Sequence, residues 1–377
     1  MTAWNPEKVR QDFVLLRNTD RVYFDNAATS QKPQCVLDAV EEFYQKYNAN
    51  VLRGLYPLSV EATERYEAAR RTVQRFIHAA CPEEIIFTRN ATESMNLVAY
   101  SYGMANLKAG DEILVSIMEH HSNILPWQMV SRATGAKLVF LECEPDGTIT
   151  KEKMDAAFSE HTRMVAVTQV SNVLGCVNDI PELVKRARAC GAAILMDAAQ
   201  SAPHMPIDVQ KLDVDFVAFS GHKMLAPMGI GVLYGKQELL EKMPPFLTGG
   251  EMIETVSRYD AVYAELPHKF EAGTVNAGGA VGLAAAIDYL ESYGMDKLHA
   301  VEQELTAYLF RGMKAIPHIH VLGSDREDNH TGIVSFAVDQ VHPHDISEVL
   351  SSDGMDIRAG HHCAQPLHDH LGVHSTA

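Results

Sequence analysis

The sequence is short of positive charge. Lys and Arg number 32 against 49 Asp and Glu, which gives a formal net charge of -17 at pH 7. An acidic protein repels nucleic-acid phosphates and anionic lipid, so we expect no nucleic acid and no membrane among its partners. Small molecules and other proteins are the expected partners.

Long apolar runs and paired cysteines are also missing. The longest run of small and apolar residues, 277–287, falls below the roughly 18 residues that a membrane-spanning helix requires. The first residues include Glu7 and Asp12 and no continuous apolar stretch, so we expect neither a secretory signal nor a transit peptide. Six cysteines are dispersed without a CxxC pair, at positions 35, 81, 143, 176, 190 and 363. This usage is typical of free thiols in a reducing cytoplasm.

The length of 377 residues predicts two domains, because a single core seldom keeps growing beyond about 250–300 residues. With 46% hydrophobic and 21% charged residues, the composition is that of a soluble globular protein. No repeat or flexible linker marks a boundary. We predict an N-terminal segment over 1–20 that packs with the small domain, a large domain over 21–287, and a smaller α+β domain over 288–377.

Alternating strands and helices predict an α/β fold. Six apolar, β-rich runs suit a parallel sheet that is covered on both faces: 84–88, 112–116, 137–141, 165–170, 193–196 and 216–219. Helical spacing covers 66–77, and a further helix starts at Asp179 and ends at Gly191. From about residue 288 we expect one long helix through 309, then strands near 320 and over 332–338 and a helix over 345–350.

Polar residues follow several strands at the sheet edge where ligands bind. Asp197-Ala-Ala-Gln200 follows the strand over 193–196, and Ser220-Gly-His-Lys223 follows the strand over 216–219. A lysine that forms a Schiff base needs a nearby phosphate anchor, an acid to keep a pyridine nitrogen protonated, and a donor to a ring oxygen. Asp197 could be the acid and Gln200 the donor, whereas a solvated surface lysine is the alternative interpretation.

The phosphate anchor has candidates in the same region. Asn90 is a predicted N-cap, with Glu93 at the capping-box position, and a helix start offers backbone N–H groups to an anion. Ser220 and His222 could complete the anchor.

Seven motifs occur in order along the chain: FDNAAT (24–29), MEHHSNILPWQ (118–128), VSNVLG (170–175), DAAQ (197–200), SGHK (220–223), FEAGT (270–274) and RAGHHCAQPL (358–367). With these motifs the sequence resembles the class V aminotransferase family over essentially its whole length. The resemblance is closest to group II, SufS-like cysteine desulfurases, which also show selenocysteine lyase activity. It implies a fold type I transferase of pyridoxal 5'-phosphate (PLP), with a mainly parallel seven-stranded sheet in the large domain.

The resemblance assigns roles around the cofactor ring. Lys223 would hold PLP as a Schiff base and move the substrate Cα proton. Asp197 would pair with the pyridinium nitrogen, and Gln200 would bond the phenolate oxygen. His120 would stack on the ring and could transfer protons near neutral pH. A buried, hydrogen-bonded imidazole is the structural alternative for this histidine.

The resemblance also assigns the cofactor phosphate and the subunit arrangement. Thr92, Ser220 and His222 would bind phosphate. Family sites lie at a dimer interface, so Thr274 would reach the phosphate of the neighbouring subunit in a homodimer. Asn172 would contact the substrate and the ring oxygen side.

Cys363 is the predicted sulfur acceptor. Arg358, His361 and His362 precede it, and positive charge nearby would favour the nucleophilic thiolate. In the resembled reaction Cys363 takes the sulfur of L-cysteine, or the selenium of selenocysteine, and alanine is released. The persulfide would pass to an acceptor protein of SufE or SufU type, for iron-sulfur cluster assembly. The other cysteines are better interpreted as small buried hydrophobic residues.

Two features depart from the family pattern. Leu52 stands before Arg53-Gly54 where relatives have histidine, so a polar contribution would be missing. The sequence ends at residue 377, before the arginine that clamps the substrate carboxylate and before a closing strand and helix. We therefore expect an incomplete small domain with exposed apolar surface and an open sheet edge. Arg358 is the candidate for substrate contact, although neither Arg358 nor Arg53 obviously replaces that arginine.

Three alternatives stay open at this stage. A different class V aminotransferase or lyase would need no sulfur-accepting thiol. A catalytically impaired subunit could still bind PLP. A metal site is a third possibility, since several histidines lie close to Cys363, but without a second cluster at zinc-site spacing we predict none. The histidines in question are His361, His362, His368, His370 and His374.

Overall fold

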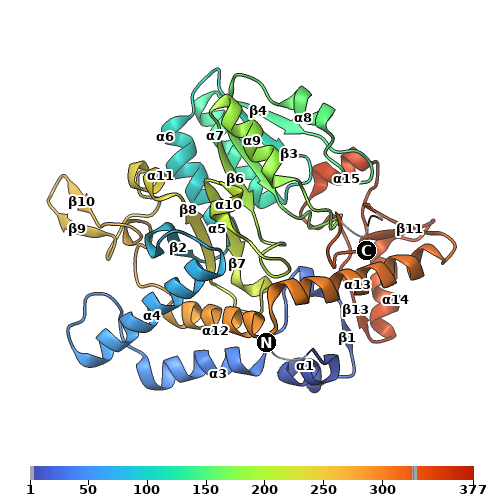
Figure 1. Cartoon of the computed structure of the whole chain (residues 1–377), viewed down its shortest axis with the longest axis horizontal. Helices are drawn as coiled ribbons and strands as arrows, with labels where there is room; N and C mark the ends of the chain where they lie inside the picture. Colours follow the sequence, from blue (N-terminus) through green and yellow to red (C-terminus); the bar gives the residue numbers. More distant parts are fainter. Residues whose placement is uncertain (1–3, 325, 327–328) are drawn as a thin grey trace.

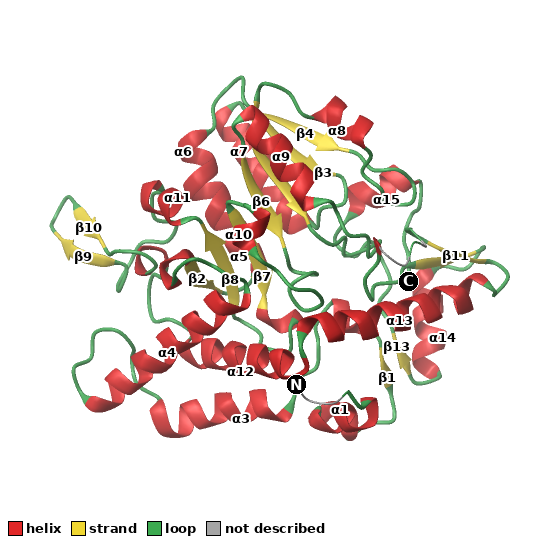
Figure 2. Cartoon of the chain, viewed as in Figure 1, coloured by secondary structure: helices red, strands yellow, loops and turns green. Residues whose placement is uncertain are grey.

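A seven-stranded sheet forms the centre of the protein in this computed structural model, which describes residues 4–324, 326 and 329–377 (Figures 1 and 2). Its order is β2-β8-β7-β6-β5-β3-β4, and only β8 runs antiparallel to its neighbours. The mainly parallel sheet confirms the predicted α/β architecture. Its strands are β2 (Ile85–Thr88), β3 (Glu112–Ser116), β4 (Lys137–Leu141), β5 (Thr162–Thr168), β6 (Ala193–Asp197), β7 (Phe216–Ser220) and β8 (Gly231–Gly235).

Helices cover both faces of this sheet. The α-helices of the described chain are α1 (Pro6–Asp12), α2 (Val14–Arg17), α3 (Gln34–Glu42), α4 (Pro57–Phe76), α5 (Ala91–Leu97), α6 (Met104–Asn106), α7 (Leu125–Thr134), α8 (Lys151–Ala157), α9 (Ile180–Cys190), α10 (Val209–Leu212), α11 (Gln237–Lys242), α12 (Ala277–Tyr293), α13 (Met295–Lys314), α14 (Pro343–Ser352) and α15 (Gln365–Leu371). Buried side chains of α4, α9 and α12 pack on one face, and those of α5, α7 and α11 pack on the other.

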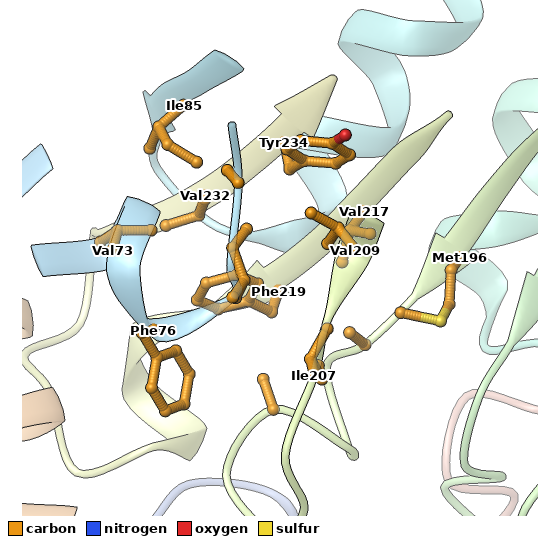
Figure 3. Close-up of a cluster of buried hydrophobic side chains, with 14 of the residues drawn as sticks. Val73, Phe76, Ile85, Met196, Ile207, Val209, Val217, Phe219, Val232 and Tyr234 are labelled. Carbon is orange, nitrogen blue, oxygen red and sulfur yellow. The ribbon is translucent and has the colours of Figure 1, made fainter. Parts of the chain in front are cut away.

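Successive strand residues supply the two apolar clusters, because side chains alternate along a strand. In β7, Val217 and Phe219 join the cluster under α4 and α12, while Phe216 and Ala218 join the opposite cluster. Figure 3 shows Phe219 among Val73, Phe76 and Val232, side chains from α4 and β8. A strand buried on both faces must be apolar throughout, which explains the continuous runs in the sequence.

Local signals place the helix ends. The Asp179 side chain accepts the Glu182 N–H and caps α9, and Gly191 ends it in the left-handed conformation at φ 71°. Asn90 caps α5 in the same way by accepting the Glu93 N–H. These two caps confirm the predictions made for residues 90 and 179.

Several predicted boundaries were wrong. β6 and β7 extend by one residue, so Asp197 and Ser220 end their strands, and β5 lies three residues earlier at its start. Sequence reasoning missed β8, which has only three apolar residues between two glycines. The single long helix expected from residue 288 is two helices, because Gly294 breaks the chain at φ 92° between α12 and α13.

The remaining strands form three small sheets: β1 (Val22–Tyr23) with β13 (Met355–Asp356), β9 (Ile253–Val256) with β10 (Ala261–Tyr263), and β11 (Ile319–Val321) with β12 (Phe336–Val338). The predicted strand over 332–338 is thus shorter, whereas the strand near 320 and the helix over 345–350 are present. Residues 375–377 are buried, and Ala377 exchanges two backbone hydrogen bonds with Phe336. This pairing covers part of the sheet edge that we expected to be open. The expected exposed apolar surface is present on α13, where Tyr308 is 73% exposed.

The N-terminal helices pack against the end of α12. The Asp12 carboxylate accepts the Tyr289 hydroxyl at 2.8 Å, and the ring of Trp4 lies edge-on to Tyr293. The proposed boundary between residues 287 and 288 lies inside α12, and we retain the division into domains as a proposal; residues 1–3 of its first segment lie outside the described part of the chain. None of the described helices is both long and apolar enough to cross a membrane.

Replacing Phe219 by alanine tests the packing of β7. Phe219 is fully buried, so its loss leaves a cavity, and we expect the free energy of unfolding to fall by about 3–5 kcal/mol. Urea unfolding measures the change. Tyr259→Ala is the control, because this tyrosine is 96% exposed and should change stability by no more than about 0.5 kcal/mol. Equal stability of the two variants would contradict the packing.

Candidate functional site

Asp197 and Lys223 meet at the carboxyl end of the sheet. Asp197 is the last residue of β6 and is 4% exposed; one of its carboxylate oxygens accepts the Ala199 N–H at 2.8 Å. Lys223 lies on the turn that follows β7. Burial lowers the pKa of Lys223 and raises that of Asp197, and the charge of each partner opposes the shift of the other. The structure therefore brings together the two residues that the sequence placed after neighbouring strands.

The FDNAAT segment fixes the turns that follow β6 and β7. The Gln200 side chain donates to the Ala27 carbonyl at 2.9 Å. The His222 carbonyl accepts the Ser30 N–H at 3.0 Å and the hydroxyl of Thr29 at 3.2 Å. The Gln200 side-chain oxygen is buried and has no hydrogen-bond partner among the described residues. The nitrogen of the same amide carries a second N–H that can donate a further hydrogen bond.

The start of α5 lies directly against β7 and β8. The Ser220 hydroxyl accepts the Ala91 N–H at 2.8 Å. A Cβ at Gly231 would lie 2.5 Å from the Asn90 Cα, so only glycine permits this approach. The Thr92 hydroxyl is 2.7 Å from the Ser122 hydroxyl, which belongs to the His120 loop. Thr92 and Ser220 therefore lie around the same helix start, as the phosphate prediction requires.

His120 is held as a neutral ring. Its Nδ1 accepts the Ser122 N–H at 3.1 Å, so the proton of the neutral ring is on Nε2. Burial, and next the charge of Lys223, lower the pKa of His120 to about 4. The uncharged ring is therefore the form in which His120 would take part in the proton transfer suggested by the resemblance.

The loop of Cys363 is hydrogen-bonded to two of the other motifs. The Cys363 carbonyl accepts the His121 N–H at 2.7 Å, and the His362 carbonyl accepts the Asn172 side-chain amide at 2.7 Å. Cys363 is exposed. The Asn172 amide that we assigned to substrate is bonded to the loop of Cys363.

The positive charge expected around Cys363 is smaller than the sequence suggested. Burial, and next the neighbouring His368, lower the pKa of His362 to about 4, so this ring is neutral at pH 7. The Arg358 guanidinium pairs with both oxygens of Asp25 at 3.1 Å. Its Nε and one terminal nitrogen are thus engaged within the chain, which leaves it a weaker candidate for a substrate carboxylate.

Two predicted residues are not joined to this group. Thr274 is exposed, and its hydroxyl makes no hydrogen bond within the described part of the chain. Leu52 has φ 77° and packs partly buried against the apolar cluster of α4 and α12, where it offers no polar side chain.

Sequence reasoning missed Glu119, which lies fully buried beside Asp197. One carboxylate oxygen accepts the Thr168 N–H at 2.7 Å and the Ser116 hydroxyl, and the other accepts the Asn123 amide at 2.7 Å. Thr168 is the register partner of Asp197. Burial, with a smaller contribution from Asp197, raises the pKa of Glu119 to about 8. An acid directly after an apolar strand was the available signal.

The histidines near Cys363 have structural partners. His368 bonds through Nδ1 to the Ala364 carbonyl at 3.0 Å, and His370 bonds through Nε2 to the Cys143 carbonyl at 2.8 Å. Across residues 4–324, 326 and 329–377, no three His, Cys, Asp or Glu side chains converge in a way that could hold a metal ion.

The pKa of Glu119 predicts a pH dependence of stability. A carboxyl whose pKa is about 8 when folded and about 4.3 when unfolded keeps its proton only in the folded chain between these values, so stability should fall as pH rises through this window. Glu119→Gln cannot titrate, and its free energy of unfolding should fall less steeply from pH 5 to pH 8. Urea unfolding across that range measures both slopes; parallel slopes would contradict the raised pKa.

Comparisons with known proteins agree with this geometry. The family described as "Aminotransferase class-V" matches residues 22–377. A probable cysteine desulfurase of Halalkalibacterium halodurans is 53% identical, over 94% of this chain and 87% of that protein.

Solved structures give the same result. The apo cysteine desulfurase of Thermococcus onnurineus NA1 is 42% identical with a TM-score of 0.95, and the cysteine desulfurase CsdA of Escherichia coli is 38% identical with a TM-score of 0.92. In both cases the similarity covers 100% of this chain and 93% of the other. The chain thus belongs to the class-V aminotransferase family.

Proposed function

We propose that this protein is a PLP-dependent cysteine desulfurase that forms L-alanine from L-cysteine and keeps the sulfur as a persulfide on Cys363. The observation that carries the proposal is the arrangement of three groups: the buried Asp197 at the end of β6, Lys223 on the turn after β7, and the Cys363 loop, which is hydrogen-bonded to the His120 loop through His121. The similarity to cysteine desulfurases over the full chain supports the same reaction.

The residues around Lys223 suit PLP. Asp197 supplies a buried carboxylate for a protonated ring nitrogen, and Gln200 retains a free N–H for a ring oxygen. Ser220 is hydrogen-bonded to the Ala91 N–H at the start of α5, and in the proposal this helix start binds the cofactor phosphate together with Thr92, Ser220 and His222. When bound, the cofactor supplies an electron sink that lowers the barrier to removing the substrate Cα proton.

The chain's own residues then divide the work. Burial favours the neutral amine of Lys223, which suits it to bind the cofactor covalently and to accept a proton. The neutral His120 offers an uncharged ring face to the cofactor. Asp197 keeps a negative charge that holds the ring nitrogen protonated.

Cys363 accepts the sulfur. Its thiolate sulfur attacks the substrate sulfur, a new S–S bond forms, and the substrate C–S bond breaks. The carbon skeleton keeps the electron pair of that bond and takes a proton to become alanine, so L-cysteine and the enzyme thiol give alanine and the enzyme persulfide. Exposure of Cys363 suits the transfer of this sulfur to an acceptor protein of SufE or SufU type. Use in iron-sulfur cluster assembly, and reaction with selenocysteine, are part of the proposal.

A homodimer belongs to the same proposal. Thr274 is exposed in the single chain and bonds to nothing within the described residues, which leaves its hydroxyl available for the phosphate site of a second subunit. Arg358 stays a proposed substrate contact through the one terminal nitrogen that Asp25 does not bind.

Replacing Lys223 by alanine tests cofactor attachment. The parent protein, incubated with PLP and dialysed, should retain visible absorbance from the bound cofactor, and Lys223→Ala should lose it. Lys185→Ala serves as the control, because that side chain is 78% exposed. Retention of the same covalent absorbance by Lys223→Ala would contradict the assignment.

Replacing Cys363 by alanine tests sulfur acceptance. With L-cysteine and a reductant, the parent should release alanine and sulfide in equal amounts, and Cys363→Ala should lose about 10²-fold or more of that rate because the nucleophile is gone. Cys35→Ala removes another exposed thiol and should react like the parent. Sulfide release by Cys363→Ala at the parent rate would show that another group accepts the sulfur.

A further inference from the structure

The backbone around Cys363 is held in an unfavourable conformation. His362 and Cys363 have φ values of 50° and 56°, two successive non-glycine residues in the left-handed region. Each such residue costs about 1–2 kcal/mol, because its Cβ crowds the following carbonyl. Contacts from outside the loop must therefore stabilise this conformation.

Outside contacts come from two loops and from Thr376, which exchanges two backbone hydrogen bonds with Gly360 and whose hydroxyl lies 3.0 Å from the His362 Nε2. Asn172 donates its amide to the His362 carbonyl at 2.7 Å. His121 contributes two hydrogen bonds: its N–H donates to the Cys363 carbonyl at 2.7 Å, and its Nε2 accepts the Gln365 N–H at 3.2 Å. Asn172 bonds to the residue before Cys363, whereas His121 bonds to Cys363 itself and to Gln365.

We propose that His121 is a positioning residue whose imidazole fixes the loop of Cys363 against the His120 side of the site. The inference rests on the proposed function for its catalytic consequence, whereas the hydrogen bonds themselves are independent of it. His121 acts through the backbone of Cys363 and Gln365, to which it is hydrogen-bonded.

The state of the ring suits this role. Nε2 can accept the Gln365 N–H only while it carries no proton. Burial, and next the charge of His361, lower the pKa of His121, which favours the accepting, neutral form at neutral pH.

His121 directly follows His120, so the position of the Cys363 loop is linked to that of His120. His120 carries the ring proposed to face the cofactor, and the ring centroids of His120 and His121 are 6.2 Å apart. One short turn thus fixes the cofactor face through one histidine and the thiol loop through the next. A loosened loop should slow sulfur transfer while the affinity for L-cysteine changes little.

The test compares two substitutions of His121 in the full chain. His121→Phe keeps a ring and removes the acceptor, while the side-chain oxygen of His121→Gln can still accept the Gln365 N–H. Hydrogen exchange of peptides spanning 360–366 should be about fivefold faster at the Gln365 amide in His121→Phe, the effect of one net hydrogen bond. The kcat for alanine release should fall about 10–100-fold, since small misplacements are costly, with KM for L-cysteine within about twofold.

Two comparisons make the result decisive. His121→Gln should restore the slow exchange and most of the kcat. His374→Phe is the matched control, because this exposed ring lies 5.5 Å from the His361 ring and makes no hydrogen bond within the described residues; it should match the parent in both measurements.

Unchanged exchange in a folded His121→Phe, verified by its thermal unfolding midpoint, would overturn the proposal, as would a His121→Gln variant that exchanges as fast as His121→Phe. If His121→Phe unfolds, the slow exchange expected of His121→Gln still decides, because only an acceptor at this position preserves it. A parent that releases no alanine would instead refute the proposed function and leave the exchange result standing.

Discussion

A carboxylate buried at the end of a strand governs this site. Asp197 has almost no contact with water and accepts a single backbone N–H, so its ionised form is costly unless positive charge lies nearby. Lys223, when protonated, offsets part of that cost, and a protonated cofactor nitrogen would offset more. Glu119, also buried, adds a second acid beside it, and its raised pKa means that it stays protonated through most of the neutral range. Burial therefore raises the pKa of both carboxyl groups at this edge of the sheet.

Long-range hydrogen bonds turn the strand ends into one site. Parallel strands bring their carboxyl ends to one edge, but the turns beyond them need separate support. The FDNAAT segment gives it: Ala27 bonds to Gln200, Thr29 bonds to His222, and Asp25 pairs with Arg358. The strand β1, which directly precedes this segment, pairs with β13. The same stretch of chain therefore connects β13 to the carboxyl end of the large sheet.

The parts of this arrangement that local sequence encodes could be predicted. Apolar runs located most strands, and capping residues located two helix starts. The positions directly after the apolar runs pointed to Asp197, Ser220 and Lys223. The strand β8 could not be recognised, because glycines stand at both of its ends: Gly231 allows the close approach of Asn90, and Gly235 lies against the Leu240 side chain. Pairing of Arg358 with Asp25, 333 residues apart, left no local signal. The neutrality of His362 was equally hidden, since it follows from burial and from His368, which only the folded chain brings near.

These unpredicted contacts change how the thiol at residue 363 must work. The basic residues before it suggested a standing positive charge, yet His362 is neutral and Arg358 is paired with a carboxylate. A Lys223 amine that has just accepted the substrate proton would carry positive charge at this edge of the sheet when sulfur is transferred, and positive charge nearby favours a thiolate. Reactivity of Cys363 would then depend on the loop that sets its distance from Lys223, which makes backbone positioning the more important determinant than fixed charge.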